Sequence, residues 1–339
     1  MNNCNGDEIK RIDICVIGGG IVGMFFASRC LTSGLSVFIV ENNNDFGGQM
    51  NLYQDKIIYN IPFINEIKSK DVISNIKKQI NNCDNFDVEF NSSIIELRKS
   101  ENVFFIKISA KNTLKTIECK YLVLATGKGY LCPNKIQIPR ANEIEGKVLF
   151  YNLDNIERFH KKNIVIIGGG DSVIDSACEL FNIANNIVVV HRREINRHEN
   201  CRFLYFENLC NSNKITLKTH YNVSDFLFKN DHCCGIAIEK DKIHEDIYCD
   251  YILVFYGLKS IQNNYDMYQK IGINFNKDGF LVNYVNNETD CKNVFAIGDC
   301  CFFNGKIKNI SAGTADALRC YYEICSREYN KIDAYEHKN

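Results

Sequence analysis

The chain has 339 residues, of which 45% are hydrophobic and 24% charged, so it is long enough for two domains and has the composition of a soluble globular protein. Its formal net charge of -1 at pH 7 gives no general attraction to nucleic acid or to an anionic membrane, and its apolar runs are too short to cross a bilayer. The 17 cysteines show neither C-x-x-C spacing nor the Cys/His spacing of a zinc site, which favours a cytoplasmic protein with free thiols and no metal.

The first recognisable unit is "IDICVIGGGIVGMFFASRCLTSGLSVFIVE", Ile12 to Glu41, which predicts a strand, a glycine turn, an amphipathic helix and a second strand. Gly18, Gly20 and Gly23 have the G-x-G-x-x-G spacing, in which the backbone bends tightly and brings the helix N-terminus to a pyrophosphate. Glu41 ends the second strand, where a carboxylate hydrogen-bonds a free ribose 2′-hydroxyl and repels a 2′-phosphate. This unit therefore predicts a site for a dinucleotide without that phosphate, such as FAD or NAD.

A second unit of the same kind is "NIVIIGGGDSVIDSACELFNIANNIVVVHRR", Asn163 to Arg193. Its predicted nucleotide-binding turn comprises Gly168, Gly170, Asp171 and Ser172. Val173 follows at the position where a third glycine or alanine is usual, so this motif is weaker than the first when it is taken alone.

The strand end of the second unit is basic, because His191 is followed by Arg192 and Arg193, and by Arg197 four residues later. Guanidinium groups at this position suit bidentate contact with a ribose 2′-phosphate, so we predict that the second unit binds NADPH. A solvent-exposed run of charge is the alternative interpretation. Two different nucleotide sites in one chain suggest that one nucleotide brings a hydride and the other holds it.

Further motifs follow in a fixed order: "DFGGQMNLYQDKIIYNIPF" (Asp45 to Phe63), "YLVLATGKG" (Tyr121 to Gly129), "YILVFYGLKS" (Tyr251 to Ser260), "NVFAIGDCC" (Asn293 to Cys301) and "ISAGTADAL" (Ile310 to Leu318). This order resembles the flavoprotein family with two dinucleotide folds that includes thioredoxin reductase and the thioredoxin-reductase-like ferredoxin/flavodoxin–NADP reductases. The resemblance covers nearly the whole chain. It implies that FAD is contacted by Gly47, Gly48, Gln49, Ala125, Thr126, Gly127, Gly298 and Asp299, with Asp299 on the ribityl chain.

The branch of the family is indicated by what precedes the second glycine turn. Thioredoxin reductases carry a C-x-x-C there, whereas residues 145–170 of this chain contain no cysteine. A disulfide relay cannot run without its thiols. The segment is similar to that of the ferredoxin-reductase branch, including Asp171 after the glycines.

Two residues are candidates for covering the flavin. Tyr53 matches the family's tyrosine that stacks on one isoalloxazine face, and a core aromatic is the alternative interpretation. The tail beyond Cys325 could place His337 where the family's C-terminal His or Tyr covers the other face, and a frayed tail is the alternative. The resemblance makes Tyr53 and His337 the residues nearest the reacting ring.

These observations together predict an α/β fold of two Rossmann-like domains, with an NADPH-binding domain (131–259) inserted in a discontinuous FAD-binding domain (1–130 and 260–339). The resemblance implies hydride transfer from NADPH to FAD and passage of single electrons to ferredoxin or flavodoxin, in a cytoplasmic homodimer. Lys128, Lys161 and Lys162 are candidates for docking an acidic carrier. The alternatives are a thioredoxin-reductase-like enzyme with another thiol relay, for which Cys300 and Cys301 are the pair to test, and an FAD/NADPH redox sensor without turnover.

Overall fold

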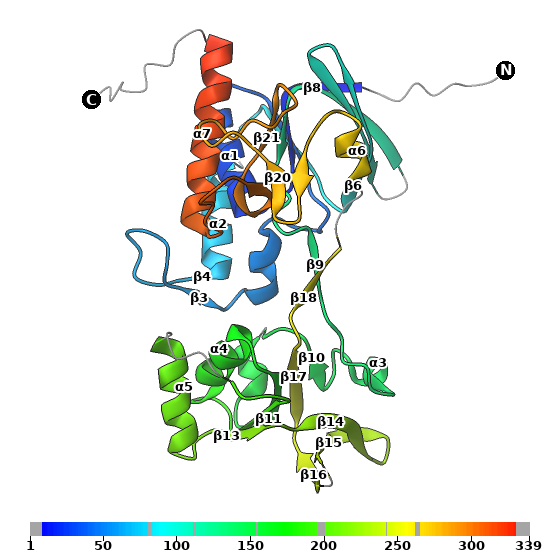
Figure 1. Cartoon of the computed structure of the whole chain (residues 1–339), viewed down its shortest axis with the longest axis vertical. Helices are drawn as coiled ribbons and strands as arrows, with labels where there is room; N and C mark the ends of the chain where they lie inside the picture. Colours follow the sequence, from blue (N-terminus) through cyan, green and yellow to red (C-terminus); the bar gives the residue numbers. More distant parts are fainter. Residues whose placement is uncertain are drawn as a thin grey trace, which may run out of the picture. The chain divides into compact units, whose positions relative to one another are not determined.

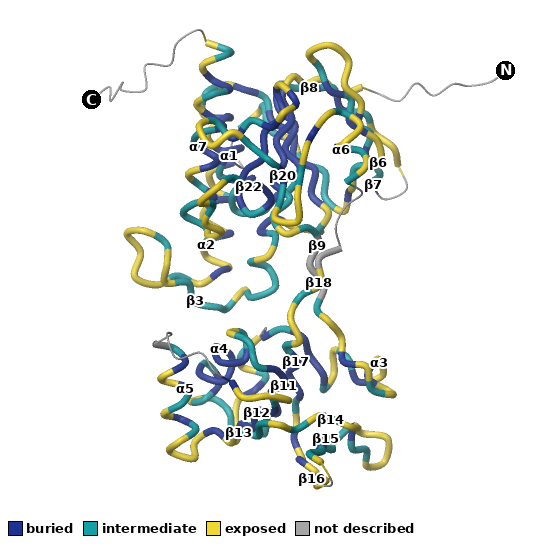
Figure 2. Tube along the Cα trace, in the orientation of Figure 1, coloured by how far each residue is buried: buried dark blue, intermediate teal, exposed yellow. Residues whose placement is uncertain are grey.

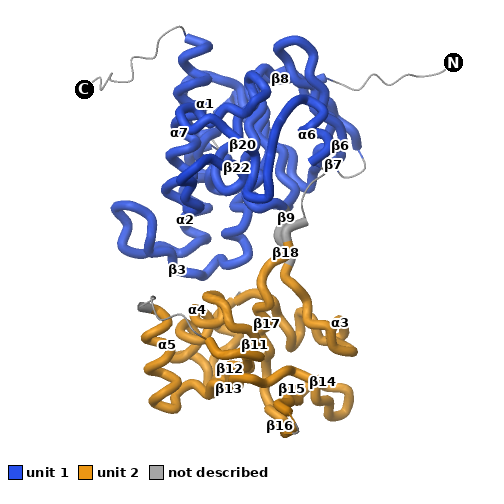
Figure 3. The backbone as a smooth tube through the Cα atoms, viewed as in Figure 1, with its two compact units in different colours: residues 1–130, 260–339 blue, residues 131–259 orange. Residues whose placement is uncertain are grey.

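The structure is a computed structural model that describes residues 9–80, 83–110, 113–153, 155–195, 201–241, 243–261 and 265–329. The chain divides into two compact units: unit 1 comprises Met1–Tyr130 and Ser260–Asn339, and unit 2 comprises Leu131–Lys259 (Figure 3). The two chain segments that join the units, β9 (Tyr130–Pro133) and β18 (Leu258–Ile261), pair as a two-stranded sheet. Within the described residues, no helix is long and apolar enough to cross a membrane.

Unit 1 is built on a seven-stranded sheet with the order β5-β2-β1-β8-β7-β6, in which β21 also pairs with β8. The strands β1, β2, β5, β8 and β21 are parallel, whereas β6 and β7 form an antiparallel hairpin that pairs with β8. Their bounds are β1 Ile9–Ile17, β2 Val37–Val40, β5 Phe86–Glu89, β6 Ser92–Ser100, β7 Val103–Ala110, β8 Thr113–Leu124 and β21 Val294–Ala296.

Two hydrophobic clusters cover the two faces of this sheet, because successive side chains of a strand point to opposite faces. Along β1, Ile14 and Val16 belong to the cluster shared with the helices, whereas Cys15 and Ile17 belong to the opposite cluster. The helices α1 (Ile21–Thr32), α2 (Ser69–Ile80) and α7 (Ile310–Tyr329) pack on the first face, where α7 lies beside α1 (Figure 1). Figure 2 shows that the central strands are the most deeply buried part of the unit.

Short elements complete unit 1 around the carboxyl ends of the parallel strands and on the second sheet face. They are η1 (Gly48–Tyr53), β3 (Ile57–Ile58), β4 (Ile67–Lys68), α6 (Asp266–Gln269), β19 (Phe275–Asn276), β20 (Gly279–Leu281), η3 (Gly298–Cys300) and β22 (Cys301–Phe302). Strands β3 and β4 form a small hairpin, and β19, β20 and β22 form a three-stranded sheet.

Unit 2 has a five-stranded parallel sheet with the order β10-β17-β11-β12-β13. Its strands are β10 Leu149–Phe150, β11 Asn163–Gly168, β12 Asn186–His191, β13 Thr216–Thr219 and β17 Tyr251–Phe255. One face packs against α4 (Asp171–Leu180), α5 (Cys201–Asn211) and η2 (Ile156–Phe159). The other packs against α3 (Ala141–Ile144) and the antiparallel sheet of β14 (Asn222–Lys229), β15 (His232–Lys240) and β16 (Ile243–Tyr248). The prediction of an α/β fold with two dinucleotide-type units is confirmed.

Candidate functional site

The first glycine turn follows β1 and is shaped by close packing against the end of β8. Gly18 has φ +111° and donates its N–H to the Val40 carbonyl oxygen at 2.9 Å. A Cβ added to Gly18 would lie 2.4 Å from the Ala125 carbonyl oxygen, and one added to Gly23 would lie 2.2 Å from the Gly18 oxygen. Only glycine fits at these two positions, because no L side chain tolerates such contacts.

Gly20, the N-cap of α1, has a different role from its neighbours. Its φ of -69° suits any residue, and an added Cβ would meet nothing within 4 Å. The protein's own packing therefore does not require glycine here. The space beside the helix N-terminus is what a pyrophosphate would fill, because the free N–H groups and the positive end of the helix dipole favour an anion there.

Glu41, directly after β2, is the acidic residue of this turn and is 4% exposed. Its Oε2 accepts a hydrogen bond from the Gly19 N–H at 2.6 Å, and its Oε1 accepts two from Asn43, from the backbone N–H at 2.7 Å and from Nδ2 at 2.8 Å. A carboxylate offers roughly four acceptor positions, so these bonds fix its orientation and leave room for one hydroxyl donor. This arrangement fits a ribose hydroxyl.

The Gly47-Gly48 turn is held against the first glycine turn. The Gly47 N–H donates to the Gly19 carbonyl oxygen at 2.9 Å, and both Gly47 and Gly48 have positive φ. A Cβ on Gly48 would lie 3.1 Å from the Gly20 Cα. The predicted FAD residues 18–23 and 47–48 are thus brought together, with Gln49 exposed on η1.

Tyr53 ends η1 and is half-buried. The Lys56 ammonium lies 5.8 Å from its ring centroid, and the ring belongs to neither hydrophobic cluster of unit 1. The stacking role of Tyr53 stays a prediction. His337 lies outside the described residues.

The ends of β8 and β21 place the remaining predicted FAD residues side by side. Ala296 is in register with Leu124, and Ala125 then donates its N–H to the Ile17 carbonyl oxygen at 2.8 Å. Thr126 and Gly127 follow Ala125, while Gly298 and Asp299 follow β21 at the same edge of the sheet. Carboxyl ends of parallel strands are where nucleotides bind in open α/β sheets.

Asp299 lies in η3 and is half-buried. Among the described residues it makes no hydrogen bond or ion pair, so its carboxylate is an acceptor that the protein itself does not occupy. Gly298, immediately before it, has φ +74°.

The second glycine turn repeats the first in unit 2. Gly168 has φ +140°, and an added Cβ would lie 2.5 Å from the Phe255 carbonyl oxygen at the end of β17. Gly170 is the N-cap of α4 and, like Gly20, has nothing within 4 Å of an added Cβ. Asp171 and Ser172 begin α4, and Val173 is fully buried at the third motif position. The residues therefore fit a second pyrophosphate.

The strand end of β12 carries the basic residues. The His191 ring lies over the glycine turn, since a Cβ on Gly169 would be 2.3 Å from the His191 Nε2. Burial, followed by the charges of Arg192 and Arg193, lowers the pKa of His191 and keeps the ring neutral. Arg192 and Arg193 are exposed and have no carboxylate partner within the described chain. Arg197 lies outside the described residues.

Sequence reasoning missed two residues at this turn. In the sequence, His191 stands out only as part of the basic run, although its ring covers the turn in the structure. Tyr256 follows β17 and is close enough for the Arg192 charge to act on its hydroxyl, whose pKa burial raises. The sequence signal for Tyr256 was its position directly after the apolar run Tyr251 to Phe255, which forms β17 and pairs with β11 in the structure.

The two adjacent thiols, Cys300 and Cys301, are buried beside the Gly298 turn. Burial raises the pKa of both thiols. Cys300 donates to the Leu124 and Ile297 carbonyl oxygens at 3.2 Å, and Cys301 donates to the Gly298 carbonyl oxygen at 3.2 Å. The described residues contain no group of His, Cys, Asp and Glu that could hold a metal ion.

Known proteins match this chain over nearly its whole length. The family model described as pyridine nucleotide-disulphide oxidoreductase matches residues 12–317. The ferredoxin–NADP reductase of Rickettsia typhi is 31% identical over 94% of this chain and 94% of its own length. That of Rickettsia bellii is 32% identical over 95% and 96%.

Solved structures with the same fold include the thioredoxin reductase of T. acidophilum, with a TM-score of 0.71 and 18% identity over 93% of this chain and 99% of that one. The bacillithiol disulfide reductase of Bacillus cereus has a TM-score of 0.70 and 18% identity over 94% and 100%.

Proposed function

Because the chain belongs to the pyridine nucleotide-disulphide oxidoreductase family, we propose that it is a flavoenzyme of the ferredoxin–NADP reductase type, which passes electrons from NADPH through FAD to a one-electron carrier. The observation that carries the proposal is the contrast between its two nucleotide turns. One is followed by a buried carboxylate, Glu41, and the other by exposed guanidinium groups, Arg192 and Arg193. Such a chain holds one nucleotide without a 2′-phosphate and one with it.

Unit 1 is the proposed FAD-binding domain. Glu41 accepts a ribose hydroxyl, the open side of Gly20 receives the pyrophosphate, and Asp299 accepts a ribityl hydroxyl. Tyr53 covers one face of the ring, and His337 is the proposed cover for the other face. Bound FAD supplies the ability to take up a hydride and to release electrons one at a time. The protein orients the ring, and we assign no residue as a general acid.

Unit 2 is the proposed NADPH-binding domain. Arg192 and Arg193 bind the 2′-phosphate, with Arg197 as the third proposed contact, and the open side of Gly170 receives the pyrophosphate. His191 stays neutral and fills the space over Gly169. A guanidinium pair that has no carboxylate partner among the described residues favours the extra phosphate of NADPH over NADH.

The proposed partner is ferredoxin or flavodoxin. The names of the Rickettsia relatives support ferredoxin, the family resemblance adds flavodoxin, and the cysteine-free segment 145–170 supports a carrier other than a disulfide. The cysteines described are free thiols, which supports a reducing cytoplasm. The family resemblance adds a homodimer to the proposal, and size-exclusion chromatography with light scattering tests it.

The thiol-relay alternative is disfavoured by the state of Cys300 and Cys301. A relay needs an accessible thiolate, whereas burial of both residues raises their pKa values and so keeps them as thiols. Each thiol donates to backbone carbonyl oxygens, as a packed structural cysteine does.

Acceptor choice tests the function. The FAD-loaded protein is given NADPH, and ferredoxin-dependent reduction of cytochrome c is compared with thioredoxin-dependent reduction of insulin. We expect turnover with ferredoxin or flavodoxin alone, unchanged in the matched Cys300→Ala and Cys301→Ala variants. Turnover with thioredoxin that either substitution abolishes would replace the proposal by a thiol relay. Reduction of the flavin without turnover on any carrier would favour the sensor.

A further inference from the structure

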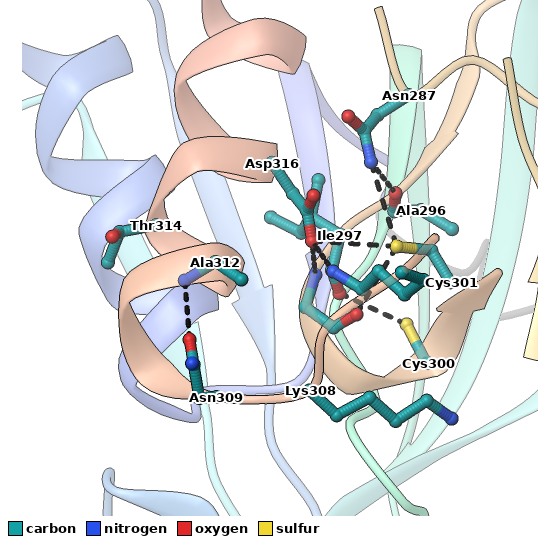
Figure 4. A network of polar contacts seen from close by, with 12 residues as sticks. Asn287, Ala296, Ile297, Cys300, Cys301, Lys308, Asn309, Ala312, Thr314 and Asp316 are labelled. Atoms are coloured by element: carbon teal, nitrogen blue, oxygen red, sulfur yellow. Dashed lines mark hydrogen bonds and ion pairs between the residues drawn. The ribbon is translucent and has the colours of Figure 1, made fainter. Parts of the chain in front are cut away.

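A buried ion-pair cluster contacts the backbone of the turn that carries Asp299, and Figure 4 shows Asn287, Cys301 and Asp316 of this cluster around Ala296 and Ile297. We call it the Asp316 cluster, and its members are Asn287, Cys301, Lys306, Asp316 and Arg319. The side chain of Asp316, on α7, is 1% exposed, and that of Lys306, in the segment before α7, is 2% exposed. The function proposed above uses none of these residues.

The Asp316 carboxylate joins α7 to the Gly298 turn. Its Oδ2 accepts the Gly298 N–H at 3.0 Å and also pairs with the Lys306 ammonium, while its Oδ1 accepts Arg319 Nη2 at 2.5 Å. Arg319 Nε donates to Asn287 Oδ1 at 3.0 Å, and Asn287 Nδ2 donates to the Ala296 carbonyl oxygen at 3.0 Å. The network therefore hydrogen-bonds the backbone on both sides of Ile297, at the Ala296 carbonyl oxygen and at the Gly298 N–H.

The Gly298 turn is confined by packing as well. A Cβ on Gly298 would lie 3.4 Å from the Val22 side chain, and one on Gly313 would lie 2.6 Å from Val22 Cγ2. The backbone of η3 thus lies between α1 and α7, with φ of Gly298 at +74°. The hydrogen bond to the Gly298 N–H is a further restraint on this confined turn, and Asp299 is the next residue along the chain.

Stability alone does not account for this cluster. Taking Lys306 and Asp316 out of water is costly, and a well-packed apolar pair of similar volume is often as stable as a buried ion pair. A carboxylate supplies an acceptor for the Gly298 N–H, and an apolar side chain does not. Without that acceptor the buried Gly298 N–H would have no partner.

We propose that Asp316 is a positioning residue, which holds the Gly298 turn through its hydrogen bond and so directs Asp299 toward the ribityl chain of FAD. This inference rests on the proposed function, in which Asp299 is the ribityl contact. Lys306 has a supporting role: it neutralises the buried carboxylate and touches no cofactor. The acceptor atom at position 316, and not the charge, is what FAD binding depends on.

Two double variants separate acceptor from charge. Both D316N/K306M and D316L/K306M remove the ion pair and keep a side chain at position 316 that branches at Cγ, but only the first keeps an oxygen for the Gly298 N–H. FAD is titrated into each purified apoprotein, and binding is followed by flavin fluorescence and by the absorbance maximum. We expect D316N/K306M to bind FAD within about threefold of the unsubstituted protein, and D316L/K306M to bind at least roughly tenfold more weakly with a shifted absorbance maximum.

A cycle with Asp299→Ala, which removes the carboxylate and leaves no acceptor at that position, tests whether the effect passes through Asp299. If it does, the ratio of the FAD dissociation constants of D316L/K306M and D316N/K306M falls toward one when Asp299 is substituted in both variants. Persistence of the full difference, or equal FAD affinity in the two double variants, overturns the proposal. Thermal unfolding of the apoproteins shows that both fold, and D316A/K306M replaces D316L/K306M if the leucine variant does not.

These titrations contain no NADPH and no electron acceptor, so their outcome is separable from that of the turnover assay. An unsubstituted chain that binds no FAD would overturn both the proposed function and this inference. Tight FAD binding with equal affinities across the variants would overturn the inference alone.

Discussion

The two glycine turns share a backbone geometry and an open helix N-terminus, and they differ in the side chains at the end of the second strand of each unit. In both, the first glycine lies against a carbonyl oxygen of the neighbouring strand end: an added Cβ would be 2.4 Å from the Ala125 oxygen at Gly18 and 2.5 Å from the Phe255 oxygen at Gly168. In both, the N-cap glycine of the following helix faces open space. The third position separates them, because Gly23 admits no side chain whereas the turn of unit 2 accommodates Val173.

The strand ends differ more sharply. Glu41 is buried and fixed by bonds to Gly19 and Asn43, so unit 1 presents a preset acceptor. Arg192 and Arg193 are exposed and have no carboxylate partner among the described residues. Unit 2 therefore offers guanidinium hydrogen-bond donors to an anionic ligand. We infer that the backbone geometry of the turns suits a dinucleotide in general, while the side chains at the strand end select which dinucleotide is bound.

The largest effects are expected when the shared backbone requirement is broken. Gly18→Ala and Gly168→Ala each place a Cβ against a carbonyl oxygen at positive φ, so each should lower the free energy of unfolding of its unit by about 3 kcal/mol or more. Urea unfolding of the apoprotein, followed by hydrogen exchange in each unit, measures this loss.

The matched controls are Gly20→Ala and Gly170→Ala, where the added methyl group meets nothing. Loss of an N-cap glycine should cost roughly 1 kcal/mol at most in the apoprotein. Their larger effect should fall on ligands, because the methyl group occupies the proposed pyrophosphate space: Gly20→Ala on FAD, and Gly170→Ala on NADPH. Normal binding of both nucleotides in these variants would contradict the assignment of the two helix N-termini as pyrophosphate sites.

The second prediction concerns the exposed strand end of unit 2. Arg192→Ala together with Arg193→Ala should raise the KM for NADPH roughly a hundredfold, since two charge-assisted hydrogen bonds to the 2′-phosphate are lost. The KM for NADH, which lacks that phosphate, should change little. Steady-state reduction of a dye acceptor gives both constants, and Lys229→Ala on the same unit serves as a control for net charge. Equal changes for the two nucleotides would contradict the 2′-phosphate assignment.

A smaller effect is expected at the strand end of unit 1. Glu41→Gln keeps an oxygen for Gly19 but brings an NH2 group to a position where Asn43 donates two hydrogen bonds. FAD affinity should fall by roughly fivefold to tenfold in an apoprotein titration. Glu89→Gln is the control, because Glu89 ends the neighbouring β5 and pairs with the exposed Lys115. A loss of similar size in the control would show that the charge of the sheet edge, and not Glu41 itself, matters.

How much of this could be predicted from the sequence depends on how local each feature is. The glycine turns and their strand ends lie within about thirty residues of chain, a span that a strand–turn–helix–strand pattern specifies. Both turns form as predicted around Gly18 and Gly168. The joining of residues 47–48 to the first turn, and of Gly298 to the end of β8, came from the family resemblance, because no local pattern indicates which strand ends meet.

The Asp316 cluster was missed because its hydrogen bonds connect distant parts of the chain. A signal was nevertheless present on α7, where Gly313, Asp316, Ala317 and Cys320 fall at helical spacing on one buried face. An acidic residue in such an apolar stripe is rarely buried without a partner. The sequence could therefore have indicated a buried ion pair, but it could not have identified Lys306 or the Gly298 N–H as the partners.

The smallest predicted effect compares how the two units respond to acid. Burial, with Arg192, Arg193 and His220, lowers the pKa of His191 below its unfolded value. The unfolded chain then binds the proton first, so unit 2 should lose stability as pH falls below about 6.5 and level off below the folded pKa. In unit 1, burial opposes ionisation of Glu288, but hydrogen bonds from Arg327 and from the Asn293 N–H prevail and lower its pKa.

The stability that Glu288 contributes is therefore present above about pH 4.3 and is lost as pH falls through its folded pKa. Between pH 7.5 and 5.5, hydrogen exchange should show unit 2 weakening while the Glu288 contribution to unit 1 stays constant. His191→Gln should flatten the response of unit 2 in that window, and Glu288→Gln should alter unit 1 only in more acidic solution. An unchanged pH response of unit 2 in His191→Gln would mean that the neutral ring over Gly169 is not what couples this turn to pH.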